Sequence, residues 1–478
     1  MLTKLEIQGF KNLLDVSVEF GPFTCIAGEN GVGKSNLFDV IEFLSHLANE
    51  PLAEAAQRIR SSSGIKSGDP RDIFWDGYRE HQREISLAAE MIVPNHVEDD
   101  LGAPAIATTT FLRYELTLGY LLPEGEGSVG RITLKHESLT HINKGDAPRH
   151  LRFPHSARDF RNSVLQGQRR GGAFLSTEER DMGTIINVHG DGGSSGRPQP
   201  RSASRTGRTV LSTVTTNDYP TILAARREMQ SWRRLALEPS ALRAPDSFSA
   251  PRTMQTDGRH LAAALYRIAT ESLQFSESGD SPDADAIYAE VADRLSDLTG
   301  VKVRGLRVTP DQVREVFTLF LIERGGLTLP ARVLSEGTLR FLALCVLLED
   351  PTVTGLICME EPENGIHPAN LPAMVRLVED LAVDAELEPN DDNPFRQVII
   401  NTHSPWIVQL CSPQDLLLAS VHPRKTPDGR VASALSLLPF NKSWRSTDSR
   451  PTFSRADITS YLGSPPGSQL MLPLELVQ

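Results

Sequence analysis

Apolar and polar residues follow two different periods along this 478-residue chain. Alternation with a period of two, which is typical of half-buried strands, occurs at 3–9, 15–20, 84–93, 111–120, 130–142, 301–308 and 316–322. Apolar residues at helical spacing occur at 258–274 and 284–298. This order predicts antiparallel hairpins in the first part of the chain and two helices after them.

A different pattern interrupts the alternation near the amino terminus. A continuous apolar run at 23–27 predicts a buried strand, and an amphipathic run at 36–47 predicts a helix. Between them stands Gly-Glu-Asn-Gly-Val-Gly-Lys-Ser at 28–35, which has the form G-x-x-x-x-G-K-S. Because a strand, a glycine-rich turn and a helix form the context that this motif requires, the segment predicts a phosphate-binding loop.

The chemistry of such a loop assigns roles to its residues. Free backbone N–H groups and the positive end of the helix hold phosphates, Lys34 would reach the terminal phosphates, and the Ser35 hydroxyl would bind Mg²⁺. The residues expected to contact the nucleotide are Gly28, Asn30, Gly31, Gly33, Lys34, Ser35 and Asn36.

A second group of short motifs begins with Leu-Ser-Glu-Gly-Thr at 334–338, directly before an apolar helical run at 339–348. Backbone N–H groups at Ser335, Glu336 and Gly337 could bind a phosphate at this helix start. A plain serine N-cap with a glutamate in the first turn explains the same residues.

Two adjacent carboxylates end the apolar strand expected at 355–361. Glu360 would bind Mg²⁺ directly or through its water, and Glu361 would accept a proton from an attacking water. His403 ends another apolar strand and could contact a γ-phosphate or position that water. A solvated acidic strand end and a structural histidine are the alternative interpretations.

The net charge excludes a chain that is basic overall but leaves room for a local basic groove. The formal charge is −12, and aromatic residues make up 6%, so that no base-stacking surface is evident. The stretch 154–243 is rich in arginine and fits either a phosphate-contacting surface or solvated arginines in a mobile loop. Within it, 189–208 is rich in Gly, Ser, Arg and Pro, which predicts a flexible loop.

Cysteine usage and hydropathy indicate the compartment. Cys25, Cys345, Cys358 and Cys411 show no C-x-x-C spacing, and three of them lie in apolar runs, as core cysteines in a reducing compartment do. The first residues read as a strand rather than a signal peptide, and no stretch reaches about 18 apolar residues. We therefore expect a soluble, cytoplasmic protein without a membrane partner.

Together these motifs resemble the ABC-type ATPase head of the branch that includes RecF, SMC and OLD-family proteins. Residues 28–35 resemble Walker A, 334–338 the signature motif, 356–361 Walker B with its catalytic glutamate, and His403 the switch histidine. Lys11 is similar to the basic residue that follows the first strand and lies near the nucleotide. More narrowly, 360–368 and 401–405 are similar to stand-alone ATPases of the AAA_21/AAA_15 type, some of them AbiEii-like.

The resemblance implies an α/β ABC-type P-loop NTPase head with a mixed or parallel core sheet, an antiparallel β subdomain and a helical insertion. Its two halves would occupy 1–150 and 301–425, with an insertion at 151–300 and a tail at 426–478. The implied cofactors are ATP and Mg²⁺, and the implied activity is ATP hydrolysis.

The chain departs from the family pattern at several positions. Glu360 stands where Walker B usually has aspartate, Glu336 replaces a glycine of the signature motif, and His367 takes the place of the usual D-loop aspartate. Glu137 is a candidate for the Q-loop residue.

In such heads the signature motif completes the site of a second subunit, so the resemblance implies a homodimer or a higher assembly of dimers with ATP between heads. The motif spacing of a Toprim nuclease domain is not evident after 425. The function implied is an ATP-gated sensor or regulator that works with a separate nuclease or toxin effector in anti-phage defence or a toxin–antitoxin-like system. The alternatives are a RecF-like ATPase that binds double-stranded DNA in repair or replication, and a stand-alone scaffold ATPase.

Overall fold

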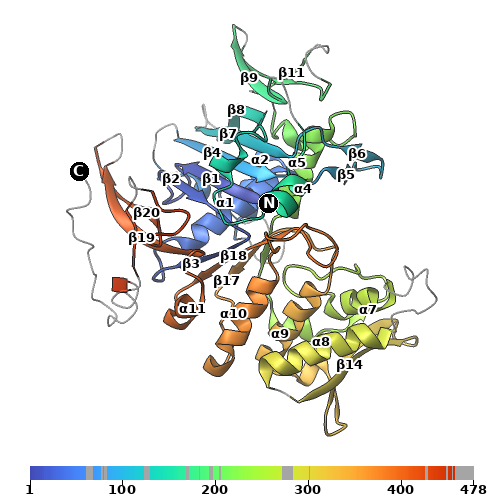
Figure 1. Ribbon diagram of the computed structural model, residues 1–478. Helices are drawn as coiled ribbons and strands as arrows, with labels where there is room; N and C mark the ends of the chain where they lie inside the picture. Colours follow the sequence, from blue (N-terminus) through green and yellow to red (C-terminus); the bar gives the residue numbers. More distant parts are fainter. Residues whose placement is uncertain are drawn as a thin grey trace.

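Two large β-sheets and a smaller third sheet form the framework of the computed structural model (Figure 1). The structure describes residues 1–60, 68–76, 79, 83–122, 130–167, 172–181, 183–192, 198–203, 206–271, 284–300, 302–425, 429–447, 451–454 and 456–457. Side chains of both large sheets join one hydrophobic core around α1 (Lys34–Leu47). The helix that follows the phosphate loop is therefore held between the sheets.

The six-stranded sheet carries the motifs of the candidate site. Its order is β12 (Arg233–Leu235), β17 (Gly355–Glu360), β18 (Arg396–Thr402), β3 (Phe23–Ala27), β19 (Leu416–Lys425) and β20 (Val431–Pro439). Neighbouring strands are parallel except β19 and β20. Because the carboxyl ends of parallel strands meet at one edge, the phosphate loop, Glu360 and His403 come to the same edge.

Helices cover both faces of this sheet. In β17, Leu356 and Cys358 pack into the core that contains α1 and α5 (Pro220–Ser231), whereas Ile357 and Met359 pack into a second core. That second core contains α7 (Leu261–Glu271), α8 (Ala284–Thr299), α9 (Glu336–Leu348), α10 (Leu371–Asp380) and α11 (Pro405–Leu410). The helices that follow the phosphate loop and the signature motif, α1 and α9, therefore lie on opposite faces.

The hairpins expected from the alternating pattern form an antiparallel sheet of eight strands. Its order is β11 (Gln199–Ser202), β10 (Gly183–Val188), β9 (Leu175–Arg180), β8 (Arg131–His141), β7 (Phe111–Leu121), β4 (Arg83–Ile92), β1 (Leu2–Gln8) and β2 (Val16–Glu19). The five strands that alternation predicts before residue 150 are confirmed, since this pattern is typical of a sheet with one face on a core.

Part of the expected flexible loop at 189–208 is a strand instead. Residues of β11 pair with β10 between Ile185 and Val188, so the backbone of this polar segment finds its hydrogen-bond partners in a ladder. Composition alone could not show this pairing, because the residues of β11, Gln-Pro-Arg-Ser, carry no alternation of apolar and polar positions. Residues 193–197 and 204–205 lie outside the described residues.

A four-stranded sheet packs with the predicted helices on the second core. It consists of β13 (Asp246–Ser247), β14 (Val303–Asp311), β15 (Val316–Glu323) and β16 (Thr328–Pro330). The remaining short elements are α2 (Leu52–Arg58), α3 (Ala147–His150), α4 (Asn162–Val164), α6 (Pro239–Arg243), β5 (His96–Glu98) and β6 (Pro104–Ile106). Helical turns of other kinds span Pro70–Ile73, Ala157–Arg161, Leu211–Thr213, Ala331–Val333 and Pro368–Asn370.

The segment expected as an insertion, 151–300, contributes to both large sheets. Strands β9 to β11 extend the antiparallel sheet, and β12 forms an edge of the six-stranded sheet. Likewise, β20 in the expected tail completes that sheet. Among the described helices, none combines the length and apolar character needed to cross a bilayer.

Candidate functional site

Close contacts at the phosphate loop require glycine at two positions. A Cβ at residue 28 would lie 2.8 Å from the carbonyl oxygen of Ala419, and one at residue 33 would lie 2.4 Å from Nδ2 of Asn12. Gly33 also has φ of 105° and Gly31 has φ of 83°, the left-handed region that glycine tolerates best. The loop therefore leaves β3 and enters α1 along a path that other residues would obstruct.

Lys34 folds back over this loop. Its ammonium group donates to the carbonyl oxygens of Gly28 at 2.7 Å and Glu29 at 2.8 Å. Burial lowers the pKa of Lys34, while the nearby carboxylates of Glu361, Glu360 and Glu363 oppose that shift. The loop thus holds a lysine, poorly solvated and close to acidic groups, where the motif predicts contact with terminal phosphates.

Asn12 braces the loop from outside, a role that sequence analysis missed. Its Nδ2 donates to the carbonyl oxygen of Val32 at 2.9 Å, and its Oδ1 accepts from Nδ2 of Asn36 at 2.7 Å. In the first turn only the basic residue, Lys11, was considered as a site residue, although the side-chain amide of the neighbouring Asn12 offers both a donor and an acceptor. Asn36 is held at the start of α1, as expected for a residue next to the phosphates, whereas Asn30 is exposed on the loop.

Lys11 points to a carboxylate in the structure. Its φ is 46°, and its ammonium group donates to Oδ2 of the fully buried Asp39 at 2.7 Å. Arg60 and Arg234 also form ion pairs with Asp39, at 2.8 and 3.2 Å. The expected contact between Lys11 and the nucleotide stays a prediction, and the ion pair with Asp39 anchors its side chain to α1.

The backbone turns sharply where β17 ends. Glu361 has φ of 45°, and its N–H donates to the carbonyl oxygen of Asn401 at 3.0 Å. Consecutive residues of a strand would point to opposite faces, so this left-handed residue allows both Glu360 and Glu361 to approach the phosphate loop. That proximity is reflected in their shared influence on Lys34.

Glu361 and His403 form a pair. Nδ1 of His403 lies 2.8 Å from Oε1 of Glu361, and Nδ2 of Asn364 donates to its Oε2 at 2.8 Å. Partial burial acts to raise the pKa of Glu361, but the hydrogen bonds from Asn364 and His403 outweigh it and lower the pKa. Glu361 is therefore an ionised, oriented carboxylate, as the role of proton acceptor requires.

Glu363 is a third carboxylate of this edge that sequence analysis left without a role. The hydroxyl of Thr402 donates to its Oε1, and within the described part of the chain its buried Oε2 has no hydrogen-bond partner. Burial raises the pKa of Glu363. A buried acceptor without a partner beside Lys34 and Glu361 fits an edge built to receive a cationic or protic group.

Ser335 of the signature motif is the N-cap of α9. The Ser335 hydroxyl accepts from the N–H of Thr338 at 3.2 Å, and Oε1 of Glu336 forms an ion pair with Arg340 at 2.9 Å. A Cβ at residue 337 would lie 3.3 Å from the carbonyl oxygen of Gly365, in the loop after Walker B. The cap interpretation is thus confirmed, and phosphate binding by Ser335, Glu336 and Gly337 stays a prediction.

A cavity of about 350 Å³ joins the ends of β12 and β17 to this helix. Its walls include Glu238, Arg340, Glu360, Glu361 and Asn364. Acidic groups predicted to act on Mg²⁺ and water therefore share a hollow with the helix that begins at the signature motif.

Glu137, the Q-loop candidate, lies in another part of the fold. It is fully buried in β8 and accepts from the backbone N–H groups of Val210 at 2.7 Å and Leu211 at 2.9 Å, as well as from Tyr114. Burial raises the pKa of Glu137 to about 7, against these hydrogen bonds. Glu137 thus stabilises the antiparallel sheet, whereas the Walker B strand lies between β12 and β18 in the six-stranded sheet.

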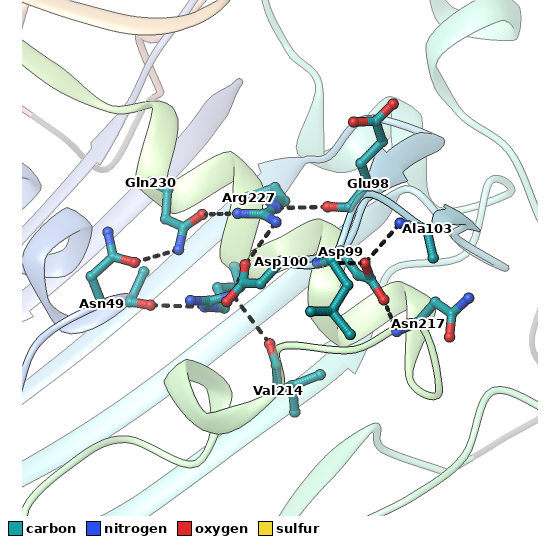
Figure 2. A network of polar contacts seen from close by, with 12 residues as sticks. Asn49, Glu98, Asp99, Asp100, Ala103, Val214, Asn217, Arg227 and Gln230 are labelled. Carbon is teal, nitrogen blue, oxygen red and sulfur yellow. Dashed lines mark hydrogen bonds and ion pairs between the residues drawn. The ribbon is translucent and has the colours of Figure 1, made fainter.

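Arg226 and Arg227, two described arginines of the basic stretch, take part in internal ion pairs. Figure 2 shows Arg227 of α5 bound to Asp100, to the carbonyl of Glu98 and to Gln230, with the Arg227–Asp100 contact at 2.8 Å. The nearly buried Arg226 forms a second pair with Asp100 at 3.0 Å. These two side chains anchor the β5–β6 region to α5 instead of facing a phosphate backbone. Arg169, Arg170, Arg197 and Arg205 of the same stretch lie outside the described residues.

The chain is similar to curated replication and repair proteins over part of their length. It is 23% identical over 178 residues to the DNA replication and repair protein RecF of Phocaeicola vulgatus, covering 35% of this chain and 45% of that protein. It is 36% identical over 66 residues to RecF of Parabacteroides distasonis, covering 14% and 18%. The chain spans less than half the length of these curated relatives.

Solved SMC heads show a weaker likeness. The SMC head domain from Thermotoga maritima is 13% identical, with 92% of this chain and 99% of that chain covered and a TM-score of 0.34. An SMC head bound to the C-terminal winged-helix domain of ScpA is 12% identical, with 92% and 98% covered and a TM-score of 0.41.

Sequence relationship is clearest at the level of the family. Residues 23–408, most of the chain, match the family described as "AAA domain, putative AbiEii toxin, Type IV TA system". This span includes the signature motif, and it includes the phosphate loop, Walker B and His403, which meet at one sheet edge of an ABC-type P-loop ATPase head. The chain therefore belongs to this family of AAA-domain ATPases.

Proposed function

We propose that the chain binds ATP with Mg²⁺ and hydrolyses it in sites shared between two copies of the head. The observation that carries this proposal is the meeting of Lys34, Glu361 and His403 at one edge of the six-stranded sheet. Residues 28–36 would hold the phosphates, and Ser35 and Glu360 would hold Mg²⁺. A bound Mg²⁺ would supply neutralisation of phosphate charge.

The remaining chemistry comes from residues of the chain. Glu361 is oriented by Asn364 and His403 and would take a proton from the attacking water. His403 would fix the direction of that carboxylate and then contact the γ-phosphate. Lys34 would exchange its two carbonyl partners for phosphate oxygens.

The placement of the signature motif favours a site shared between copies. Helix α9 lies on the face of the sheet opposite α1, so Ser335 at its start belongs to a different side of the head from the phosphate loop. The Ser335 side chain is exposed, which leaves the cap open to another molecule. A second copy could bring this cap to the phosphates held by the first.

Complementation between two inactive variants tests the shared site. Lys34→Ala disables the phosphate loop, and Ser335→Arg blocks the signature cap that one copy would offer to the phosphates of the other copy. In a dimer of either single variant, both sites lack one half, so each variant alone is expected to be inactive. A mixed dimer would contain one intact site, and equal mixing is expected to restore about a quarter of the wild-type ATPase rate. Mixtures as inactive as the separate variants would contradict the shared site.

We propose further that ATP-driven pairing of heads regulates a separate effector, a nuclease or a toxin, in anti-phage defence or a toxin–antitoxin-like system. The description of the family supports this role. Bacteria carrying the gene with its neighbours are expected to resist phage, as measured by plaque counts, and Lys34→Ala is expected to abolish the resistance. Equal protection by the variant would contradict the proposed ATP dependence.

The similarity to RecF supports a second candidate, a DNA-binding ATPase of repair or replication. Salt-dependent binding of the isolated protein to duplex DNA would favour this candidate, because phosphate contacts release counterions. Absence of binding at low salt would favour the defence role. The pairing of Arg226 and Arg227 with Asp100 leaves these arginines no part in such a surface.

A further inference from the structure

Arg234 links the Walker B strand to the helix of the phosphate loop. It lies on β12, opposite Cys358 of β17 in a parallel register. Its Nη2 is 3.0 Å from Oε1 of Glu360, and its Nη1 is 3.2 Å from Oδ1 of Asp39 on α1. One guanidinium therefore bridges the carboxylate expected to hold Mg²⁺ and a fully buried carboxylate of α1.

The bridge is part of a charge-balanced network. Its carboxylates are Asp39, Glu42 and Glu360, and its cations are Lys11, Arg60 and Arg234. Arg234 is the member that contacts all of these carboxylates, with Nη1 lying 3.5 Å from Oε2 of Glu42. A planar guanidinium with five donors suits this arrangement, whereas a lysine ammonium would act as a single point charge.

The ion pair with Arg234 bears on the direction of the Glu360 side chain. Glutamate has one more methylene than the aspartate usual at this Walker B position, and therefore one more rotatable bond. A metal-binding carboxylate needs a fixed direction, and partners outside the metal's own ligands commonly provide it. Arg234 forms an ion pair with Oε1 of Glu360 and so holds this longer carboxylate near β12 and α1.

We propose that Arg234 is a positioning residue for Glu360, which fixes this longer carboxylate so that it presents one oxygen to Mg²⁺. The proposal rests on the proposed function, because it assigns Mg²⁺ to Glu360. It also means that β12, a strand from the segment between the two halves of the head, controls the metal side of the site.

ATP binding measured by calorimetry with Mg²⁺ and with EDTA tests this role. Arg234→Gln is expected to reduce the Mg²⁺-dependent gain in ATP affinity about tenfold, the loss typical when a ligand's supporting partner is removed. Affinity in EDTA is expected to stay within about twofold of the wild type, because the phosphate loop is intact. Arg234→Lys keeps the positive charge but not the planar set of donors. Its Mg²⁺-dependent gain is expected to lie between those of Arg234→Gln and the wild type.

A double-mutant cycle separates positioning from general stabilisation. In a Glu360→Gln background, Arg234→Gln is expected to change the Mg²⁺-dependent gain no further, because the two residues act through one interaction. Arg227→Gln, which removes an ion pair with Asp100, is the matched control and is expected to leave the gain unchanged. Thermal unfolding verifies that each variant is folded.

Three results would overturn the proposal. The first is a Mg²⁺-dependent gain in ATP affinity that is unchanged in Arg234→Gln and Arg234→Lys. The second is a larger gain in these variants, which would make Arg234 a competitor of Mg²⁺. The third is additive losses in the double mutant. If Arg234→Gln does not fold, the lysine variant decides between these results. Failure of the wild-type chain to bind ATP in Mg²⁺ would instead refute the proposed function itself.

Discussion

Replacement of Lys34 with alanine is expected to weaken ATP binding roughly 100-fold, or by about 3 kcal/mol. The ammonium group already donates to two carbonyl oxygens of the phosphate loop, so phosphate oxygens would take over existing donors without new ordering of the side chain. Hydrogen bonds between charged groups are worth about 1.5–3 kcal/mol each, and alanine offers none. Equilibrium binding of ATP to the purified chain measures the loss.

The fold should tolerate this change. Burial lowers the pKa of Lys34, which means that its charged ammonium group is poorly solvated in the folded chain. Removing the side chain therefore removes this desolvation cost. Lys4→Ala is a suitable control, since Lys4 lies on β1 and pairs with Glu6 outside the site. Unchanged ATP affinity in a folded Lys34→Ala chain would refute the assignment of residues 28–35 as the phosphate loop.

Replacement of Glu361 with glutamine is expected to lower the rate of ATP hydrolysis by about 100- to 10,000-fold, the contribution typical of a general base. An amide keeps the size of the side chain and can still contact Asn364 and His403, but it cannot accept the proton of the attacking water. Phosphate release under saturating ATP and Mg²⁺ measures the rate.

The same variant should trap the paired state. If hydrolysis separates two heads, Glu361→Gln keeps ATP intact and its ATP-dependent association should match or exceed that of the wild type, as measured by light scattering. Glu84→Gln, at a surface pair with Lys135, is the matched control. Normal hydrolysis by the Glu361 variant would remove Glu361 as the base and leave Glu363 as the next carboxylate of that edge.

Local sequence predicted the elements of this head well, because each element leaves a short-range signature. Strands β1, β2, β4, β7 and β8 follow from alternation, and α7 and α8 follow from helical spacing. The phosphate loop required no tertiary knowledge, since its glycines, its lysine and its flanking strand and helix are consecutive. The left-handed φ of Glu361 turns the backbone at the two glutamates, which a strand pattern alone does not predict.

Interactions between distant segments were not accessible in this way. Arg234 carries no motif, and only the parallel pairing of β12 with β17 brings it to Glu360. Glu137 was a candidate for the Q-loop residue, yet burial and two backbone donors make it a structural residue of β8. Composition predicted a flexible loop at 189–208, although β11 within this segment pairs with β10.

Residue type and neighbours a few positions away were enough to predict which residues are candidates for phosphate binding and proton transfer. The tertiary structure decided which of them meet: parallel strands brought Lys34, Glu361 and His403 to one edge, and the two cores separated α1 from α9. Burial and charge pairing, which depend on the packing of the whole chain, determined the surroundings of Glu360, Glu361 and Glu363.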